Sequence, residues 1–309
     1  MNSTEYFKGD ELAASVWEGK YAAEGESNPD EMHKRMAEEF ARIENKYTSE
    51  EFELLQQGRI EKDLSKYGKT RKTLNYKRIF DLFKDFKYIV PQGSIMSMLG
   101  VDKIGSLSNC FVIGQPEDSY GGILQKDEQL VQLMKRRGGV GIDISTLRPS
   151  GTDVTNAAKT STGAASFMER FSNSTREVAQ GGRRGALMIT IDVRHPDVLE
   201  FVNCKKDRSK VTGANISVML RDDFMEAVKK DEDYILRFPC EIPTENIYNQ
   251  LMDFSYAGFS DFDYGVSKTM ENAIDGEFTF KKIKAKELYD SIVENAWENA
   301  EPGQMFIDR

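Results

Sequence analysis

Histidine and cysteine are scarce in this chain, which limits the kinds of metal and disulfide site it can form. Its 309 residues include two histidines, His33 and His195, so a histidine-rich metal site is excluded and we expect no metal ligands. The three cysteines, Cys110, Cys204 and Cys240, are odd in number and widely spaced. That spacing matches neither the disulfide framework of a secreted domain nor a zinc site, and it indicates a reducing, cytoplasmic compartment.

Long apolar runs and an excess of positive charge are also missing. No segment approaches the ~18 consecutive apolar residues of a membrane span, and the N-terminus has no apolar signal segment. The net charge is −9 and the pI about 5.1, which argues against nucleic-acid binding through a basic surface. With 39% hydrophobic residues, the chain is long enough to bury a core of ordinary size. We therefore predict a soluble, intracellular α/β protein that contacts neither nucleic acid nor membrane.

The chain divides into a charged helical part, residues 1–88, and a part with alternating patterns, residues 89–309. In the first part, Pro29 inside a helix start and Thr48-Ser49 as a further N-cap predict separate helices, and His33 among charged residues is predicted to lie at the surface. The second part alternates apolar runs with helical patterns, which predicts a mainly parallel sheet. The expected strands are 94–99, 110–113, 140–144, 186–193 and 214–219, and the expected helices are 123–135, 167–178, 196–202 and 222–230.

The last 70 residues differ in composition and in pattern from the residues before them. Residues 240–279 are acidic and aromatic between turn residues, and we predict an insertion on the domain surface. Residues 283–300 then have the pattern of an amphipathic helix, and residues 304–309 that of a buried strand. A domain rarely ends partway into such a strand, so we expect another segment or polypeptide to complete the sheet.

A glycine- and arginine-rich loop joins the predicted helix 167–178 to the predicted strand 186–193. Its sequence is Gln180-Gly181-Gly182-Arg183-Arg184-Gly185. Glycines let a ligand approach the main chain, and arginine presents a planar fork of donors to phosphate or to a base edge. The loop is therefore either a nucleotide-sensing element or a solvated turn whose arginines pair with surface carboxylates.

Cys110 stands where a polar loop enters an apolar strand, a position that suits either a reactive thiol or a small buried side chain. Cys204 and Cys240 lack polar, small neighbours and are expected to be structural. The run Arg136–Gly141 is rich in glycine but lacks the Gly-Lys-Ser/Thr ending of a phosphate-binding P-loop. Together with Arg148 beside a turn and Asp118-Ser119 as ribose ligands, these loops favour a nucleotide enzyme.

Six motifs in one order resemble the catalytic subunit of ribonucleotide reductase. They are Ser106-Leu-Ser-Asn-Cys110, Arg137-Gly-Gly-Val-Gly141, Leu147-Arg-Pro-Ser-Gly151, Gln180-Gly-Gly-Arg-Arg-Gly-Ala186, His195-Pro-Asp-Val-Leu-Glu-Phe201 and Asn215-Ile-Ser-Val218. The resemblance covers almost the whole chain except residues 240–279 and is closest to the adenosylcobalamin-dependent class. It implies a helical N-terminal domain followed by the first half of a ten-stranded α/β barrel.

The resemblance also implies roles for individual residues. Cys110 matches the first cysteine of the redox pair that reduces the ribose 2′ carbon and becomes a disulfide in each turnover. The residues that match substrate-contacting positions are Gly93, Ser94, Ser108, Asn109 and Gly139. Those that match the site for a deoxynucleotide or ATP effector are Asp118, Ser119, Arg148 and Thr155. Residues Gln180 to Gly185 match the loop that relays the identity of the effector to the substrate base.

Parts of the family's machinery have no counterpart here, namely the thiyl-radical cysteine and the second redox cysteine. We expect a complementary C-terminal polypeptide to supply them, whether the enzyme is naturally split or the chain truncated. Adenosylcobalamin is the implied radical source, with a separate metal-containing subunit as the alternative. A thioredoxin-like reductant and a homodimer are further expectations. The alternative functions are a non-catalytic, deoxynucleotide-binding regulatory fragment and a structural piece that folds only on docking.

Overall fold

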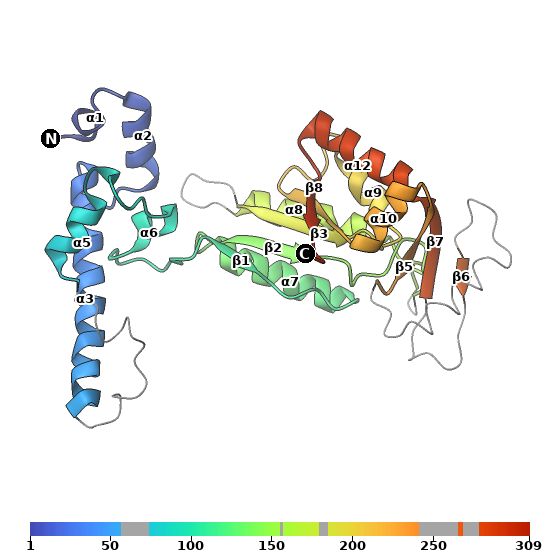
Figure 1. Ribbon diagram of the computed structural model, residues 1–309, viewed down its shortest axis with the longest axis horizontal. Coiled ribbons are helices and arrows are strands. Elements are labelled where there is room, and N and C mark those ends of the chain that lie inside the picture. The colour runs from blue at the N-terminus through green and yellow to red at the C-terminus, as the bar shows by residue number, and fades with distance from the viewer. Residues whose placement is uncertain (57–73, 155–156, 179–184, 241–264, 268–277) are drawn as a thin grey trace. The chain divides into compact units, whose positions relative to one another are not determined.

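The computed structural model describes residues 1–56, 74–154, 157–178, 185–240, 265–267 and 278–309 (Figure 1). By its internal contacts the chain divides into two compact units, Met1–Asn109 and Cys110–Arg309. The boundary expected after residue 88 therefore falls inside the first unit. Among the helices that are described, none is long and apolar enough to cross a membrane.

The first unit is helical, as expected. Its helices are α1 (Ser3–Tyr6), α2 (Glu11–Lys20), α3 (Pro29–Gln56), α5 (Tyr76–Phe83), the 3-10 turn η1 (Lys84–Phe86) and α6 (Gly93–Met98). Its core is built from side chains that recur at helical spacing, including Trp17, Met32, Met36, Ile79 and Phe83. Arg35 joins α3 to the end of α6, since its guanidinium pairs with Glu26 at 2.7 Å and donates to the carbonyl oxygens of Met96 and Leu99.

Three expectations about this unit are wrong. Residues 94–99 form most of α6 instead of a strand, because Met96 and Leu99, three residues apart, both reach the core, and the Ser97 hydroxyl donates to Gly93 O one turn back. Helix α3 runs through Thr48 and Ser49 without a break. His33 is completely buried, since it shares the core face of α3 with Met32 and Met36.

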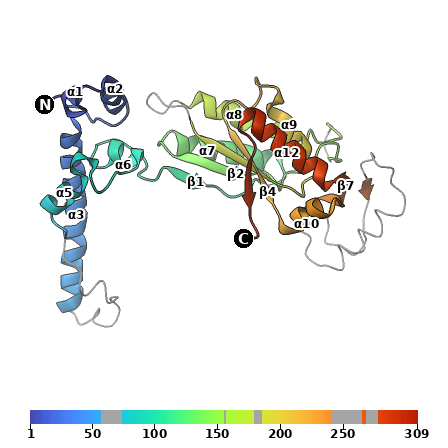
Figure 2. The ribbon, with the colours of Figure 1, turned by 45° about the horizontal axis from the view of Figure 1, so that its top comes forward.

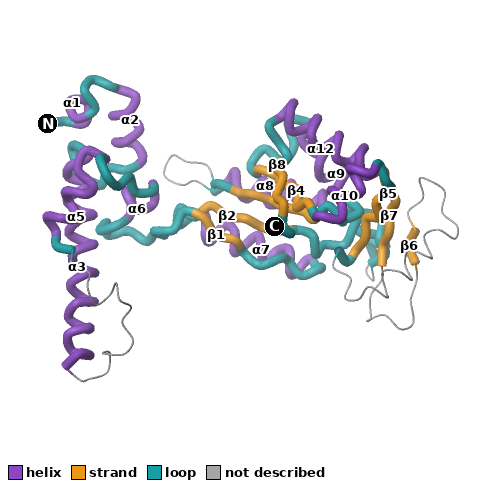
Figure 3. The backbone as a smooth tube through the Cα atoms, viewed as in Figure 1, coloured by secondary structure: helices purple, strands orange, loops and turns teal. Residues whose placement is uncertain are grey.

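The second unit contains a five-stranded parallel sheet, whose strands are the orange stretches of tube in Figure 3 and are joined by purple helices. In order across the sheet, the strands are β1 (Cys110–Val112), β2 (Gly139–Asp143), β3 (Leu187–Asp192), β4 (Asn215–Leu220) and β8 (Gly303–Phe306). Every neighbouring pair is parallel. The expected α/β fold with a parallel sheet is thereby confirmed. The strands are parallel because each β-α-β connection returns the chain to the same end of the sheet.

Helices α7 (Tyr120–Met134), α8 (Ala164–Glu177), α9 (Val198–Asn203) and α12 (Ala285–Asn299) pack beside one another in that order (Figure 2). The 3-10 turn η2 (Cys204–Lys206) and α10 (Asp222–Lys230) complete the layer. Leucines, methionines and phenylalanines of these helices meet the sheet in one core, whose fully buried members include Leu130, Met134, Ile189, Phe171 and Phe201. Burying a side chain of this size contributes about 1.5–3 kcal/mol, so the helical layer holds the sheet in shape.

A second, antiparallel sheet was not expected. It has the order β5 (Asp233–Phe238), β7 (Phe278–Lys284) and β6 (Gly265–Ser267). Residues 283 and 284, which were expected to begin the helix 283–300, belong to β7, and α12 begins at Ala285. Most of the predicted insertion 240–279 lies outside the described residues, and its placement at the surface stays a prediction.

Candidate functional site

Cys110 lies on the face of the parallel sheet that points away from the helical layer. Phe111 pairs in register with Val140, which is buried in the core under the helices. Successive residues of a strand point to opposite faces, so Cys110 and its partner Gly139 point the other way. Cys110 is exposed, and an accessible thiol is what disulfide exchange requires.

Small and polar residues, together with Met188 and Met219, line this face along β2 to β4. Along β2 to β4 the residues that alternate with the core positions are Gly139, Gly141, Asp143, Met188, Thr190, Asp192, Asn215, Ser217 and Met219. Such a surface leaves room for a polar ligand beside the thiol. The face of the sheet that carries Cys110 is therefore the chain's candidate catalytic surface.

The amino ends of β1 to β4 form one edge of this surface. Gly139 begins β2 opposite Cys110, and Gly185 stands two residues before β3. A Cβ atom on Gly185 would lie 2.8 Å from Thr175 O, so the chain passes α8 at a distance that only glycine permits. Of the predicted loop, this glycine alone is described; Gln180, Gly181, Gly182, Arg183 and Arg184 lie outside the described residues.

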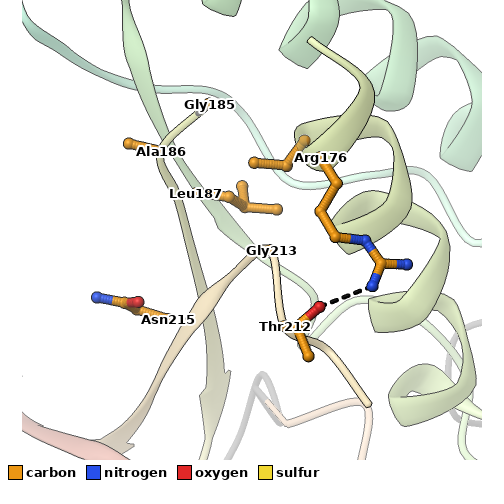
Figure 4. Close-up of a pocket in the computed structure, with 8 residues that line it drawn as sticks. Arg176, Gly185, Ala186, Leu187, Thr212, Gly213 and Asn215 are labelled. Carbon is orange, nitrogen blue, oxygen red and sulfur yellow. Dashed lines mark hydrogen bonds between the residues drawn. The ribbon is translucent and has the colours of Figure 1, made fainter. Parts of the chain in front are cut away.

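A pocket of 230 Å³ opens beside Gly185 at this edge (Figure 4). Arg176 at the end of α8 reaches across it, and its Nη1 donates to the Thr212 hydroxyl at 2.7 Å. The lining residues are Thr175, Arg176, Gly185, Ala186, Leu187, Thr212, Gly213 and Asn215. The pocket combines a cation, hydroxyls and open backbone, a lining that suits a small polar group.

The other predicted substrate residues belong to the first unit. Asn109 and Ser94 are close, since the Ser94 amide donates to Asn109 Oδ1 at 3.1 Å at the start of α6, next to Gly93. Ser108 is exposed, and its amide donates to the Ser106 hydroxyl at 3.0 Å. Gly93, Ser94 and Asn109 are thus neighbours within the first unit, and their role as substrate contacts stays a prediction.

The predicted effector residues come together at the carboxyl ends of β1 and β2. Arg148 is held by Asp118 twice, through its backbone amide at 3.0 Å and its Nε at 2.8 Å. Ser119 is the N-cap of α7, and its hydroxyl accepts from the Gly122 amide at 3.0 Å. Thr155 lies outside the described residues. Both Asp118 and Arg148 are partly exposed, so this pair offers a cation and a carboxylate to solvent.

The effector cluster and Gly185 lie at opposite ends of the same sheet. Helix α7 runs between the two ends, and its 15 residues span about 22 Å at ~1.5 Å per residue. One small nucleotide does not bridge that distance within one chain.

The second unit matches a known protein family. Residues 108–309 match the family described as the barrel domain of ribonucleotide reductase, which is more than half of the chain. The chain belongs to the ribonucleotide reductase family. The resemblance of the motifs is thereby confirmed at the level of the family, and the parallel sheet described above belongs to its barrel domain.

The relatives of this chain include vitamin B12-dependent reductases and a reductase large subunit. The chain is 32% identical over 71% of its length to a vitamin B12-dependent ribonucleoside-diphosphate reductase of Thermoplasma acidophilum, covering 24% of that protein. It is 31% identical over 59% of its length to an enzyme of the same name from Mycobacterium tuberculosis, covering 27%. It is 29% identical over 63% of its length to a ribonucleoside-diphosphate reductase large subunit of Caenorhabditis elegans, covering 24%. The chain spans about a quarter of the length of these relatives.

Sequence reasoning missed two buried groups beside the effector cluster of this reductase-family chain. His195 and Asp197 are both almost inaccessible and follow β3 in the turn before α9. Burial lowers the pKa of His195, which keeps the ring neutral. The sequence signal for these groups is His195-Pro196-Asp197, where two polar residues follow a buried strand.

Proposed function

We propose that this chain is the N-terminal part of a ribonucleotide reductase and that Cys110 supplies one of two reducing thiols. The observation that carries the proposal is the position of Cys110, exposed on the open face of a reductase-family barrel sheet and in register with Gly139. Reduction at the ribose 2′ carbon replaces a hydroxyl by hydrogen. Two thiols provide the two electrons and two protons, so the products are a deoxyribonucleotide, water and a disulfide.

Under this proposal the ribonucleotide lies against glycine backbone and small polar side chains. Gly139 lets the ribose approach the strand next to the thiol. For Ser94, Ser108 and Asn109 of the first unit, the role of substrate contacts rests on the family resemblance alone. The second thiol of the pair and the radical cysteine come from a complementary C-terminal polypeptide. A thioredoxin-like dithiol then reduces the disulfide so that a further turnover can begin.

The radical source is proposed from the relatives. Two of the three relatives named above are described as vitamin B12-dependent, which favours adenosylcobalamin over a separate metal-containing subunit. The 230 Å³ pocket beside Gly185 is too small for a corrin ring.

Under this proposal the chain itself presents Cys110, holds the ribonucleotide and binds a deoxynucleotide or ATP effector at Asp118, Ser119 and Arg148.

The direct test combines the chain with its complementary polypeptide, adenosylcobalamin, a dithiol reductant and a ribonucleoside diphosphate. Deoxyribonucleotide is measured by chromatography over many turnovers. We expect product with the natural chain and loss of multiple turnover with Cys110→Ser. The matched control is Cys204→Ser, because Cys204 is half-buried and burial raises its pKa to about 11.

Each outcome has a clear meaning. Unchanged multiple turnover in Cys110→Ser removes the role assigned to this thiol. Deoxynucleotide binding without reduction in the presence of any complementary polypeptide favours a regulatory fragment, for which the exposed Asp118–Arg148 pair would suffice.

A further inference from the structure

One buried carboxylate, that of Asp197, joins three segments at the carboxyl end of the sheet. Asp197 is 3% exposed. Its Oδ2 accepts from the Ala164 amide at 2.9 Å, at the first residue of α8, and both oxygens accept from the Ser150 amide at 3.1 Å. These donors are 33 and 47 residues away along the chain. A buried carboxylate is tolerated where backbone N–H groups compensate its charge, as they do here.

The two segments held by Asp197 are the two ends of one hairpin. The two described arms of this hairpin, residues 150–154 and 157–164, lie side by side, with hydrogen bonds from Gly151 N to Ser161 O at 3.0 Å and from Ser161 N to Thr152 O at 2.8 Å. Asp153 and Thr160 form a β-bridge in the same hairpin. Both ends of the hairpin therefore rest on the same carboxylate.

Gly163 shows how closely the hairpin is fitted to this carboxylate. Its φ is +88°, in the region that favours glycine. A Cβ atom at this position would lie 2.5 Å from Asp197 Oδ2 and 2.7 Å from Ser150 N. Any larger residue would separate the carboxylate from its donors.

The hairpin in turn holds Arg148, the predicted effector ligand. Arg148 Nη1 donates to the carbonyl oxygen of Asp153 at 2.8 Å, while its Nε faces Asp118. The guanidinium is thus fixed between the hairpin on one side and Asp118 on the other. A movement of the hairpin would release one of these two supports.

His195 reinforces the same connection. Its Nδ1 accepts from the Asp197 amide at 3.0 Å, so the proton of the neutral ring is on Nε2, which donates to Leu147 O at 2.8 Å. Leu147 immediately precedes Arg148. The turn from His195 to Asp197 therefore holds the backbone on both sides of Arg148, at Leu147 and at Ser150.

We infer that Asp197 is a positioning residue for nucleotide effectors: it holds the two described arms of the hairpin, 150–154 and 157–164, in the arrangement that orients Arg148 for an anionic deoxynucleotide. The inference rests on the proposed function for its ligand, but the hairpin geometry can be tested without it. Asp197 stands at the carboxyl end of the sheet, opposite Cys110. We therefore expect it to control effector affinity and to leave the reactivity of the Cys110 thiol unchanged.

The test uses Asp197→Asn, which keeps the shape of the side chain but replaces one acceptor oxygen by a donor. The matched control is Asp207→Asn, because Asp207 is exposed and accepts from Ser209 in its own turn. Hydrogen exchange of the amides of Gly151 and Ser161 is measured against the amides of β3. The binding probes are dATP and dTTP, titrated by calorimetry.

We expect the two hairpin amides of Asp197→Asn to exchange at least tenfold faster while the β3 amides keep their protection. We expect dATP and dTTP to bind about tenfold more weakly, since hydrogen bonds to a charged group are lost. Saturating dATP should restore the hairpin protection, which a merely structural role of Asp197 would not produce. Asp207→Asn should behave as the natural chain.

The outcomes separate this inference from the proposed function. Natural affinity and natural hairpin protection in Asp197→Asn overturn the inference. Failure of the natural chain to bind either deoxynucleotide counts against the effector site, while faster hairpin exchange in the variant still supports the holding role. If Asp197→Asn loses β3 protection as well, Gly163→Ala displaces the carboxylate without removing its charge, and unchanged hairpin exchange in that variant also overturns the inference.

Discussion

His33 offers a sharp test of how the first unit is stabilised. The imidazole is fully buried, 4.7 Å from the Phe86 ring and 6.3 Å from the Phe83 ring. Among the described residues neither ring nitrogen has a hydrogen-bond partner, and Asp30 Oδ1 is 3.7 Å from Nδ1. A buried polar group without a partner costs about 1–3 kcal/mol. Replacing His33 by leucine should therefore raise the free energy of unfolding of the first unit by about 1–3 kcal/mol at neutral pH.

The effect should depend on pH in a defined direction. Burial lowers the pKa of His33 below its ordinary value of 6.5, although Asp30 opposes the shift. On acidification the unfolded chain therefore takes up the proton first. Protonation of His33 therefore leaves the free energy of unfolding unchanged above about pH 6.5. As the pH falls from there towards the folded-state pKa, it lowers that free energy by up to ~1.4 kcal/mol per pH unit. His33→Leu lacks this loss, so its advantage should grow between pH 7.5 and pH 5.5.

The assay is urea unfolding followed by the fluorescence of Trp17, which is 3% exposed in the core of the first unit with its Nε1 3.5 Å from Met32 Sδ. Trp297, which is 84% exposed, is replaced by phenylalanine throughout to simplify the signal. Lys34→Leu on the exposed side of α3 is the control and should keep the natural pH dependence. Equal stability and equal pH dependence in His33→Leu and the natural chain would refute the reasoning.

Two further predictions concern the second unit. A thiol reagent at pH 8 should modify Cys110 much faster than the other cysteines, because burial raises the pKa of Cys204 to about 11 and also raises that of Cys240. Absorbance at the reagent's wavelength follows the reaction, and a fast phase that persists in Cys110→Ser would contradict the assignment. Arg221→Met should cost about 3–5 kcal/mol in urea unfolding, because it leaves the buried Asp192 carboxylate without the guanidinium that donates to it at 2.8 and 3.0 Å. A cost below about 1 kcal/mol would show that the pair is not needed.

Local patterns were sufficient where each element buries one side in a regular way. The apolar runs that became β1 to β4 and the helical patterns that became α7 to α10 were placed within a few residues, because spacing along the chain decides which side chains share a face. Residues 94–99 were misread, since a short apolar run fits a strand and a buried helix equally well. His33 was misread for a related reason: its charged neighbours point to solvent, while its own position on α3 faces the core.

The second sheet shows a different limit. Strand β5 pairs with β7, whose first residue comes 40 positions after the last residue of β5 (278 − 238). No local feature of residues 233–238 specifies that partner. The register is decided by which apolar side chains, such as Tyr234 and Leu236, reach the core once the helices have packed.

The sequence by itself determined the family and most element types between residues 110 and 230, because the motifs and the spacing of apolar residues are local. The roles of Cys110 and Arg148 are predictions that follow from such motifs. Only the tertiary structure decided that Cys110 faces away from the helices opposite Gly139, and that Asp197 holds the two ends of the hairpin beside Arg148. The physical reason is distance along the chain: hydrogen bonds between residues 33 and 47 positions apart form only when the parallel sheet has brought its loops together.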